Sequence, residues 1–333
     1  MKSIIFRAIF VAFLSLEVGL SPALAEHPGT SSDIQNLKQR IKALEAGQVE
    51  SPAEEPSFPL MTAGKYLTLG GVLELEANYT DSDGEDDSSD LALATAELSL
   101  EVAINEQIGG HVILLYEEDQ GDDALNVDEA VISLHCPKPF FGQTAAFYGG
   151  KLYVPFGKFN SNMVSDPLTL DLGETNDTAA IFALEGDLWN LRLGVFNGGT
   201  DAAGDDDQID SLVAALEVTP MDNLSFGASY LSDLAESDSE LVADTTLYGD
   251  SVAGAAAFVS VTFGPVGLDA EILGALDDFD AALVGVPDSD LTGKKPLTWN
   301  LEASFQTTDV LLLAARYEQA EDFQDDVKRY GAT

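Results

Sequence analysis

Residues 67–79 read LTLGGVLELEANY, and this stretch decides the fold class of the chain. Apolar or small side chains occupy the odd positions, while the even positions carry most of the polar ones: Thr68, Glu74, Glu76 and Asn78. A period of two places these sets on opposite faces of an extended strand. One face suits lipid and the other suits water, a pattern that is typical of a transmembrane β-strand.

The alternation recurs along the rest of the chain. Residues 96–104 repeat it with reversed parity, and further runs follow at 112–116, 130–134, 145–154, 180–188, 189–195, 212–218, 224–230, 253–263, 266–272, 297–305 and 311–317. With a fourteenth strand beginning near Val327, we expect an all-β fold, an antiparallel transmembrane β-barrel over residues 66–333. Closed single-chain barrels have an even strand number, and by analogy with porins the full barrel would have about sixteen. Residues 327–333 are too few to cross a bilayer, so we expect the C-terminus to be truncated.

Connection lengths alternate as well. Short connections are expected at 105–109, 136–143, 186–187, 219–223, 264–265 and 307–309, and longer ones at 80–90, 117–126, 155–177, 197–210, 232–252 and 275–296. Acidic residues gather in the longer set, as in residues 81–87. Short periplasmic turns and long external loops are typical of outer-membrane barrels.

The N-terminal part is organised differently. Residues 1–25 have the basic start, short apolar run and Ala23-Leu24-Ala25 end of a secretory signal peptide. Residues 26–50 are expected to form a periplasmic coiled-coil segment and residues 51–65 a proline-containing linker. The heptad seam within residues 33–46 suggests a contact between copies of the chain, although a solvated helix with an apolar stripe fits equally well.

Composition excludes several functions. A net charge of −43 argues against nucleic-acid binding. No hydrolase, metalloprotease or phosphate-binding motif occurs, so neither an enzyme nor a cofactor is expected. His111, His135 and Cys136 would meet if Glu117 paired with Glu129, but solvated lumen residues are the favoured interpretation and no metal site is expected. The acidic loops lack EF-hand spacing and are expected to be solvated, with loose ion bridging to lipopolysaccharide as the alternative.

The most individual stretch is GGKLYVPFGKF at residues 149–159, followed by SDPLTL at 165–170 and LGET at 172–175. In these two elements and in the N-terminal segment the chain resembles the LbtU-like family of siderophore porins. That resemblance implies an outer-membrane β-barrel that passes ferric siderophore without a plug domain. The C-terminus departs from the family pattern.

Residues 155–177 form the third expected external loop, and many porins fold such a loop into the lumen. We expect a constriction built from this loop, although a cap lying on the rim is the alternative. The constriction residues would be Pro155, Phe156, Gly157, Lys158, Asp166, Asp171 and Glu174. Strand parity places a second set on the inward face, as opposed rows of basic and acidic lumen charge: Lys151, Arg192 and Arg316, with Glu74, Glu76, Glu97, Glu101 and Glu302.

The sequence therefore favours an outer-membrane porin, in contact with lipid and lipopolysaccharide, that takes up ferric siderophore or a similar small solute. A carbohydrate- or anion-selective porin is the second hypothesis. A non-transport surface β protein is the third.

Overall fold

The computed structural model describes residues 4–13, 66–81, 88–117, 125–163, 165–200, 209–239, 241–242, 248–280, 291–308, 311–323 and 327–333. These residues are almost entirely β. The strands are β1 (Ile4–Phe13), β2 (Leu67–Asp81), β3 (Ser88–Asn105), β4 (Ile108–Glu117), β5 (Asn126–His135), β6 (Thr144–Tyr153), β7 (Asn176–Glu185), β8 (Trp189–Phe196), β9 (Ser211–Met221), β10 (Leu224–Leu231), β11 (Gly254–Phe263), β12 (Val266–Ala275), β13 (Leu297–Thr308), β14 (Leu311–Glu321) and β15 (Lys328–Ala332). One short helix, α3 (Leu168–Gly173), and one 3-10 turn, η1 (Leu234–Glu236), complete the described elements. No helix in this part of the chain is long and apolar enough to cross a membrane.

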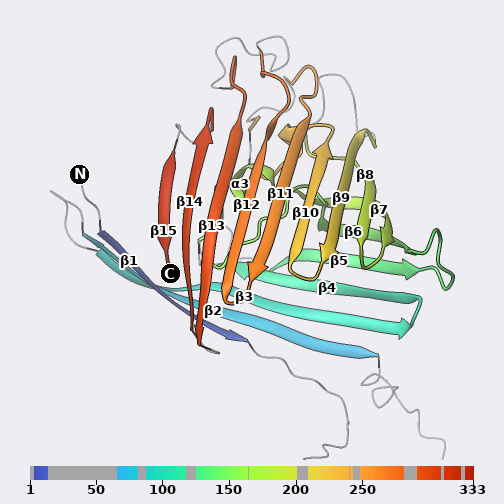
Figure 1. Cartoon of the computed structure of the whole chain (residues 1–333), viewed down its shortest axis with the longest axis horizontal. Coiled ribbons are helices and arrows are strands. Elements are labelled where there is room, and N and C mark those ends of the chain that lie inside the picture. The colour runs from blue at the N-terminus through green and yellow to red at the C-terminus, as the bar shows by residue number, and fades with distance from the viewer. Residues whose placement is uncertain are drawn as a thin grey trace, which may run out of the picture.

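The strands form one sheet in which each strand pairs with its neighbour in sequence, from β1 to β15. Every pair is antiparallel, as in β11 with β12 and β13 with β14. The sheet curves strongly, and α3 lies on its concave side against β12, β13 and β14 (Figure 1). The expected all-β antiparallel fold is confirmed, and each of the fourteen expected strands coincides with one of β2–β15.

The expected closure of the barrel is not observed. Within the described residues no pairing joins β15 to β1, so the sheet is an open, curved series rather than a closed ring. The local reason is the shortness of β15, which pairs only with residues 315–319 of β14. The rest of the β14 edge therefore lacks a described strand partner on that side.

The structure describes only one segment of the N-terminal part, and the predictions for this part stay predictions. Residues 4–13, inside the expected signal peptide, form β1 and pair antiparallel with β2 from Asp81 to Val72. An apolar segment that exposes its backbone groups can pair with any strand edge, so cleavage after Ala25 stays a prediction. The expected coiled-coil segment and linker, residues 26–65, lie outside the described residues, which resume at Tyr66.

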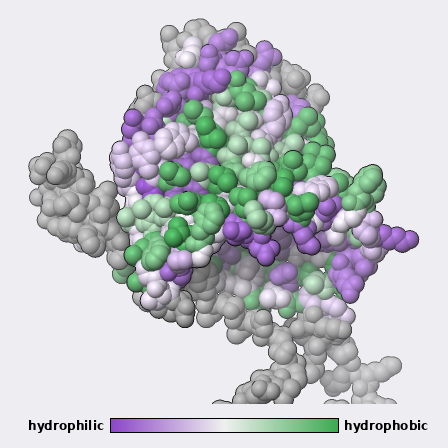
Figure 2. All heavy atoms as spheres, in the orientation of Figure 1, coloured by the Kyte–Doolittle hydropathy of each residue, from purple (hydrophilic) through white to green (hydrophobic). Residues whose placement is uncertain are grey.

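The two faces of the sheet differ as the alternation predicts. Large apolar side chains stand exposed on the convex face: Leu98, Ile132, Phe182, Leu193, Leu216, Phe226, Val259, Leu268, Leu301 and Leu313. Figure 2 shows apolar side chains gathered over the middle of the visible face, with hydrophilic ones toward the loop end. The concave face carries polar and small side chains together with a buried apolar cluster that includes Leu152, Ile181 and Leu273. This face carries the candidate site.

Candidate functional site

The concave face is partly filled by a single connection, residues 154–175, which we call the inner loop. It leaves β6, carries α3, and returns to β7 after packing on the inner face of the later strands. Phe156 and Leu172 are almost fully buried in a cluster with Leu231 and Leu273 from the sheet. Apolar packing therefore contributes to holding both ends of the inner loop against the wall.

Three buried glutamates on adjacent strands bind the polar backbone of the inner loop. Glu271, Glu302 and Glu318 are 5%, 1% and 3% exposed. A carboxylate that accepts backbone N–H groups satisfies donors which an irregular buried segment would otherwise leave unpaired. Glu271 accepts from Lys158 N (2.6 Å), Phe159 N (3.0 Å) and Thr169 Oγ1 (3.0 Å); Glu302 from Asn162 N (2.7 Å), Asn162 Nδ2 (2.9 Å) and Ser161 Oγ (2.9 Å); and Glu318 from Leu168 N (2.9 Å).

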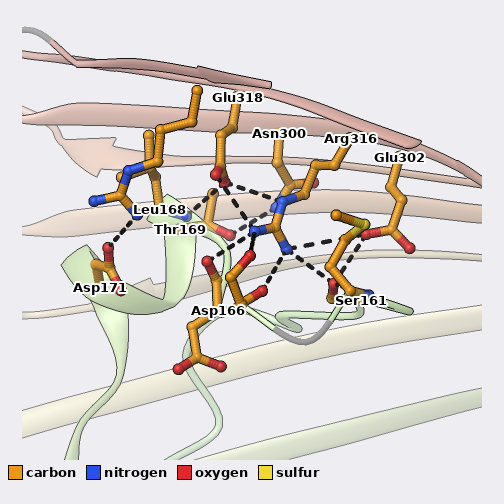
Figure 3. A network of polar contacts seen from close by, with 12 residues as sticks. Ser161, Asp166, Leu168, Thr169, Asp171, Asn300, Glu302, Arg316 and Glu318 are labelled. Atoms are coloured by element: carbon orange, nitrogen blue, oxygen red, sulfur yellow. Dashed lines mark hydrogen bonds and ion pairs between the residues drawn. The ribbon is translucent and has the colours of Figure 1, made fainter. Parts of the chain in front are cut away.

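Arg316 completes this attachment from β14. Its guanidinium points into the inner loop between Glu302 and Glu318 (Figure 3). It donates to Ser161 Oγ, Ser165 O, Ser165 Oγ and Asp166 O, all at 2.9 Å. It also lies 3.2 Å from a Glu318 oxygen and 4.0 Å from a Glu302 oxygen. One buried cation thus links two wall carboxylates to the middle of the inner loop.

A second acidic cluster fixes the neighbouring connection after β10. Glu236 accepts from Gly199 N (2.6 Å) and Thr200 N (3.1 Å), and Asp233 accepts from Tyr248 Oη (2.9 Å). Burial raises the pKa of Asp233 to about 6 and that of Glu236 to about 7, although these hydrogen bonds act in the opposite direction. The connections at this end of the sheet are therefore tied together through carboxylates.

The charged residues expected in the constriction separate into two places. Lys158 lies against the wall, where its Nζ is 3.1 Å from Glu217 of β9. Asp166, Asp171 and Glu174 gather at the other end of the inner loop, and Asp171 pairs with Arg329 at 3.3 Å. Burial, followed by the negative charge of Asp238, raises the pKa of Glu174 to about 7.

The other constriction residues, Pro155, Phe156 and Gly157, shape the start of the inner loop. Gly157 adopts φ +80°, and its N–H donates to Ser229 Oγ at 2.9 Å. A positive φ favours glycine. The inner loop lies on the concave face, as the expected constriction requires, while its effect on a pore stays a prediction.

Most of the expected lumen charges have the inward register. Arg316 and Glu302 face the inner loop, and Arg192 lies 3.7 Å from Glu185. On the earlier strands Glu74 pairs with Thr95, Glu97 with Val72 and Glu101 with Thr68, all in the inward register. Glu76 belongs to β2, but its side chain is outside the described residues.

The inward placement of Lys151 is wrong. Its strand neighbours are Ala130 and Thr178, which have the outward register, and its Nζ donates to Val127 O at 2.9 Å. Leu152 on the other face is buried in the core cluster instead. The opposed rows of basic and acidic charge therefore lose one basic member.

The histidines are also arranged differently from the expected pairing. His111 is registered with Val131 and bonds Glu129 at 2.8 Å, whereas His135 bonds Tyr148 at 3.3 Å. The register differs by four residues from a pairing of Glu117 with Glu129, and an even difference keeps both rings inward. Among the residues that the structure describes, no three His, Cys, Asp or Glu side chains are grouped to hold a metal ion. Cys136 is exposed.

Sequence reasoning missed several residues that attach the inner loop. Glu271, Glu318, Glu217 and Ser161 were not among the expected site residues. Glu318 follows Arg316 by two positions, so the parity argument that selected Arg316 also selects Glu318. The partners on the inner loop have no comparable signal, because an irregular segment has no period.

Comparisons with known proteins are consistent with a distant relationship only. No family model matches the chain. A UPF0422 protein of Legionella pneumophila (strain Lens) is 28% identical over 155 residues, covering 45% of this chain and 28% of that protein. A UPF0422 protein of Coxiella burnetii (strain RSA 493 / Nine Mile phase I) is 26% identical over 273 residues, covering 78% of this chain and 57% of that protein. The chain thus matches between about a quarter and somewhat over half of the length of these curated relatives.

Among solved structures, the outer membrane channel DcaP of Acinetobacter baumannii matches 80% of this chain and 93% of its own, with 11% sequence identity and a TM-score of 0.43. A likeness at this level supports no conclusion about function. Membership of the siderophore-porin family stays a prediction.

Proposed function

We propose that this chain is a porin-like outer-membrane channel for small solutes, narrowed by its inner loop. The observation that carries the proposal is the contrast between the two faces of one curved sheet. Its convex face exposes large apolar side chains such as Phe182, Leu193 and Leu301. Its concave face carries buried carboxylates and an attached loop.

A soluble protein would have difficulty with such a convex face. Monomeric soluble proteins rarely expose contiguous apolar patches above a few hundred Å². Transfer of apolar surface out of water is favourable by roughly 25 cal/mol per Å². In transmembrane β-barrels the strands expose apolar side chains to lipid on their outward face. The apolar convex face therefore supports an outer-membrane location over an exported adhesin.

Attachment of the inner loop to the concave face supports a constriction rather than a cap on the rim. Lys158, Asn162 and Leu168 donate to glutamates of β12, β13 and β14 that lie within the strands rather than at their ends. A segment held there by buried carboxylates reduces the space available to solute. The siderophore is the proposed solute on the basis of residues 149–175 alone, and a carbohydrate- or anion-selective porin is the alternative.

Single-channel recording tests the channel. The purified full chain, reconstituted in planar bilayers, should produce stepwise conductance, and deletion of residues 160–172 should increase the step size. An unchanged step size after the deletion would contradict the constriction. Uptake of radiolabelled ferric siderophore by a deletion strain, with and without the gene, then tests the solute; unaltered uptake alongside altered sugar uptake would favour the alternative.

A further inference from the structure

The basic side chains of the concave face are already neutralised by neighbouring carboxylates. Among the described residues, four basic side chains face inward, and each lies within 4.0 Å of a carboxylate: Lys158 with Glu217, Arg192 with Glu185, Arg316 with Glu302 and Glu318, and Arg329 with Asp171. Lys151, the fourth expected base, has the outward register. The concave face therefore does not present the expected opposed rows of basic and acidic charge to a solute.

The acidic side chains divide between the two halves of the sheet. On β12, β13 and β14, respectively, Glu271, Glu302 and Glu318 are buried beneath the inner loop. On β3 the half-buried Glu97 and the exposed Glu101 have no ion-pair partner among the described residues, and no described residue of the inner loop lines the cavity wall at Glu101. Free negative charge thus remains on the half of the wall that the inner loop does not cover.

This uncovered half also contains a recess of about 660 Å³ between β2 and β6. Ser99, Glu101, His111, Glu129, His135 and Tyr148 are among the residues that line it. Among the described residues, no lysine or arginine lines the recess. Glu129 is hydrogen-bonded to His111 at 2.8 Å, and Tyr148 Oη donates to Glu185 at 3.0 Å. The recess therefore offers carboxylates, hydroxyls and an aromatic ring, which together suit a cation rather than an anion.

We propose that the recess is the selectivity site of the channel and that it favours small cationic solutes over anions. The inference rests on the proposed function, because only a conducting lumen can select. Clefts lined by one sign of charge concentrate the opposite ion, and rings of Asp or Glu favour cations in channels. The inner loop contributes by covering Arg316, whereas it leaves Glu101 uncovered.

Reversal potentials in planar bilayers test the proposal. With the full chain under a KCl gradient at neutral pH, we expect the sign of a cation-selective pore. Glu101 lines the recess, and Glu97 has the same inward register on β3. The double variant Glu97→Gln/Glu101→Gln should lower the permeability ratio of K⁺ to Cl⁻ by about twofold or more. The charge-matched control Asp187→Asn/Asp222→Asn removes two exposed carboxylates from short turns and should keep the ratio of the unmodified chain.

The outcomes separate the two claims. Conductance steps with a reversal potential at zero or of anionic sign would overturn the selectivity and leave the channel standing. Absence of any conductance would overturn the proposed function and the selectivity with it. A cation-selective pore whose ratio falls equally in the double variant and in the control would show that the recess is not the selectivity site.

Discussion

Replacement of Arg316 by methionine should release the inner loop. The side chain is 3% exposed and makes four hydrogen bonds of 2.9 Å to the inner loop besides its contacts with Glu302 and Glu318. Methionine retains most of the volume but supplies no donor. Two carboxylates that are 1% and 4% exposed as side chains would then lack their shared cation.

The expected cost is large for one substitution. Removal of one partner of a buried ion pair costs about 3–5 kcal/mol, because the other charge stays buried without compensation. Glu302 keeps Ser161 and Asn162 as donors, whereas Glu318 keeps only Leu168 N on the inner loop. We therefore expect Glu318 to suffer more, and the double variant Arg316→Met/Glu318→Gln to recover part of the loss.

Two assays follow the inner loop directly. Lys158 lies in its first half and is held by Glu271 and Glu217, so trypsin cleavage after Lys158 should be slow in the unmodified chain and fast in Arg316→Met. Single-channel steps should become larger and noisier in the same variant. The control Arg192→Met removes an exposed base with one ion pair at 3.7 Å and should change neither readout appreciably. Arg316→Met with unaltered cleavage and step size would refute the attachment of the inner loop through this residue.

Three further predictions concern the rim, α3 and the convex face. The pKa of Glu174 rises from its ordinary 4.5 to about 7, so the stability that the protonated side chain contributes is complete below pH 4.5 and is lost as the pH rises through 7. Glu174→Gln should therefore raise the melting temperature more at about pH 8 than at about pH 5. An equal or opposite effect at the two pH values would contradict this prediction. Gly173→Ala places a Cβ 2.3 Å from Leu273 Cδ1, so it should lower the free energy of unfolding in urea titrations by about 1–3 kcal/mol. Adding Leu273→Ala should recover part of this free energy, and no recovery would show that the contact is unimportant. Leu301→Arg in the middle of β13 should make the free energy of folding into lipid bilayers less favourable by about 2–4 kcal/mol, and Leu311→Arg at the end of β14 should weaken it much less. Equal losses in the two variants would count against a membrane-embedded convex face.

The strands could be predicted from sequence because each has two different environments. In residues 67–75 the odd positions are leucine or glycine and the even positions include Thr68 and Glu74, and the observed β2 has that register. The same reasoning fails in β6, where apolar residues occupy both faces. Leu152 and Val154 face inward because the inner loop covers them with Phe156, and Lys151 consequently faces outward. The packed loop, rather than the strand period, determines the orientation there.

Parity gives the face of a residue but not its partner, and the glutamates of the concave face illustrate the difference. Glu101 and Glu302 have the same inward register, yet one lines an open recess and the other is buried against the backbone of the inner loop. Whether such a glutamate is buried depends on the positions of backbone N–H groups in the inner loop, such as those of Lys158, Asn162 and Leu168. The inner loop is irregular, so its sequence has no period from which these positions could be predicted. The same loop conformation places Lys158 beside Glu217 and covers Arg316. One loop conformation thus fixes both the width of the proposed pore and the charges left to line it, so constriction and selectivity should respond together when the inner loop is displaced.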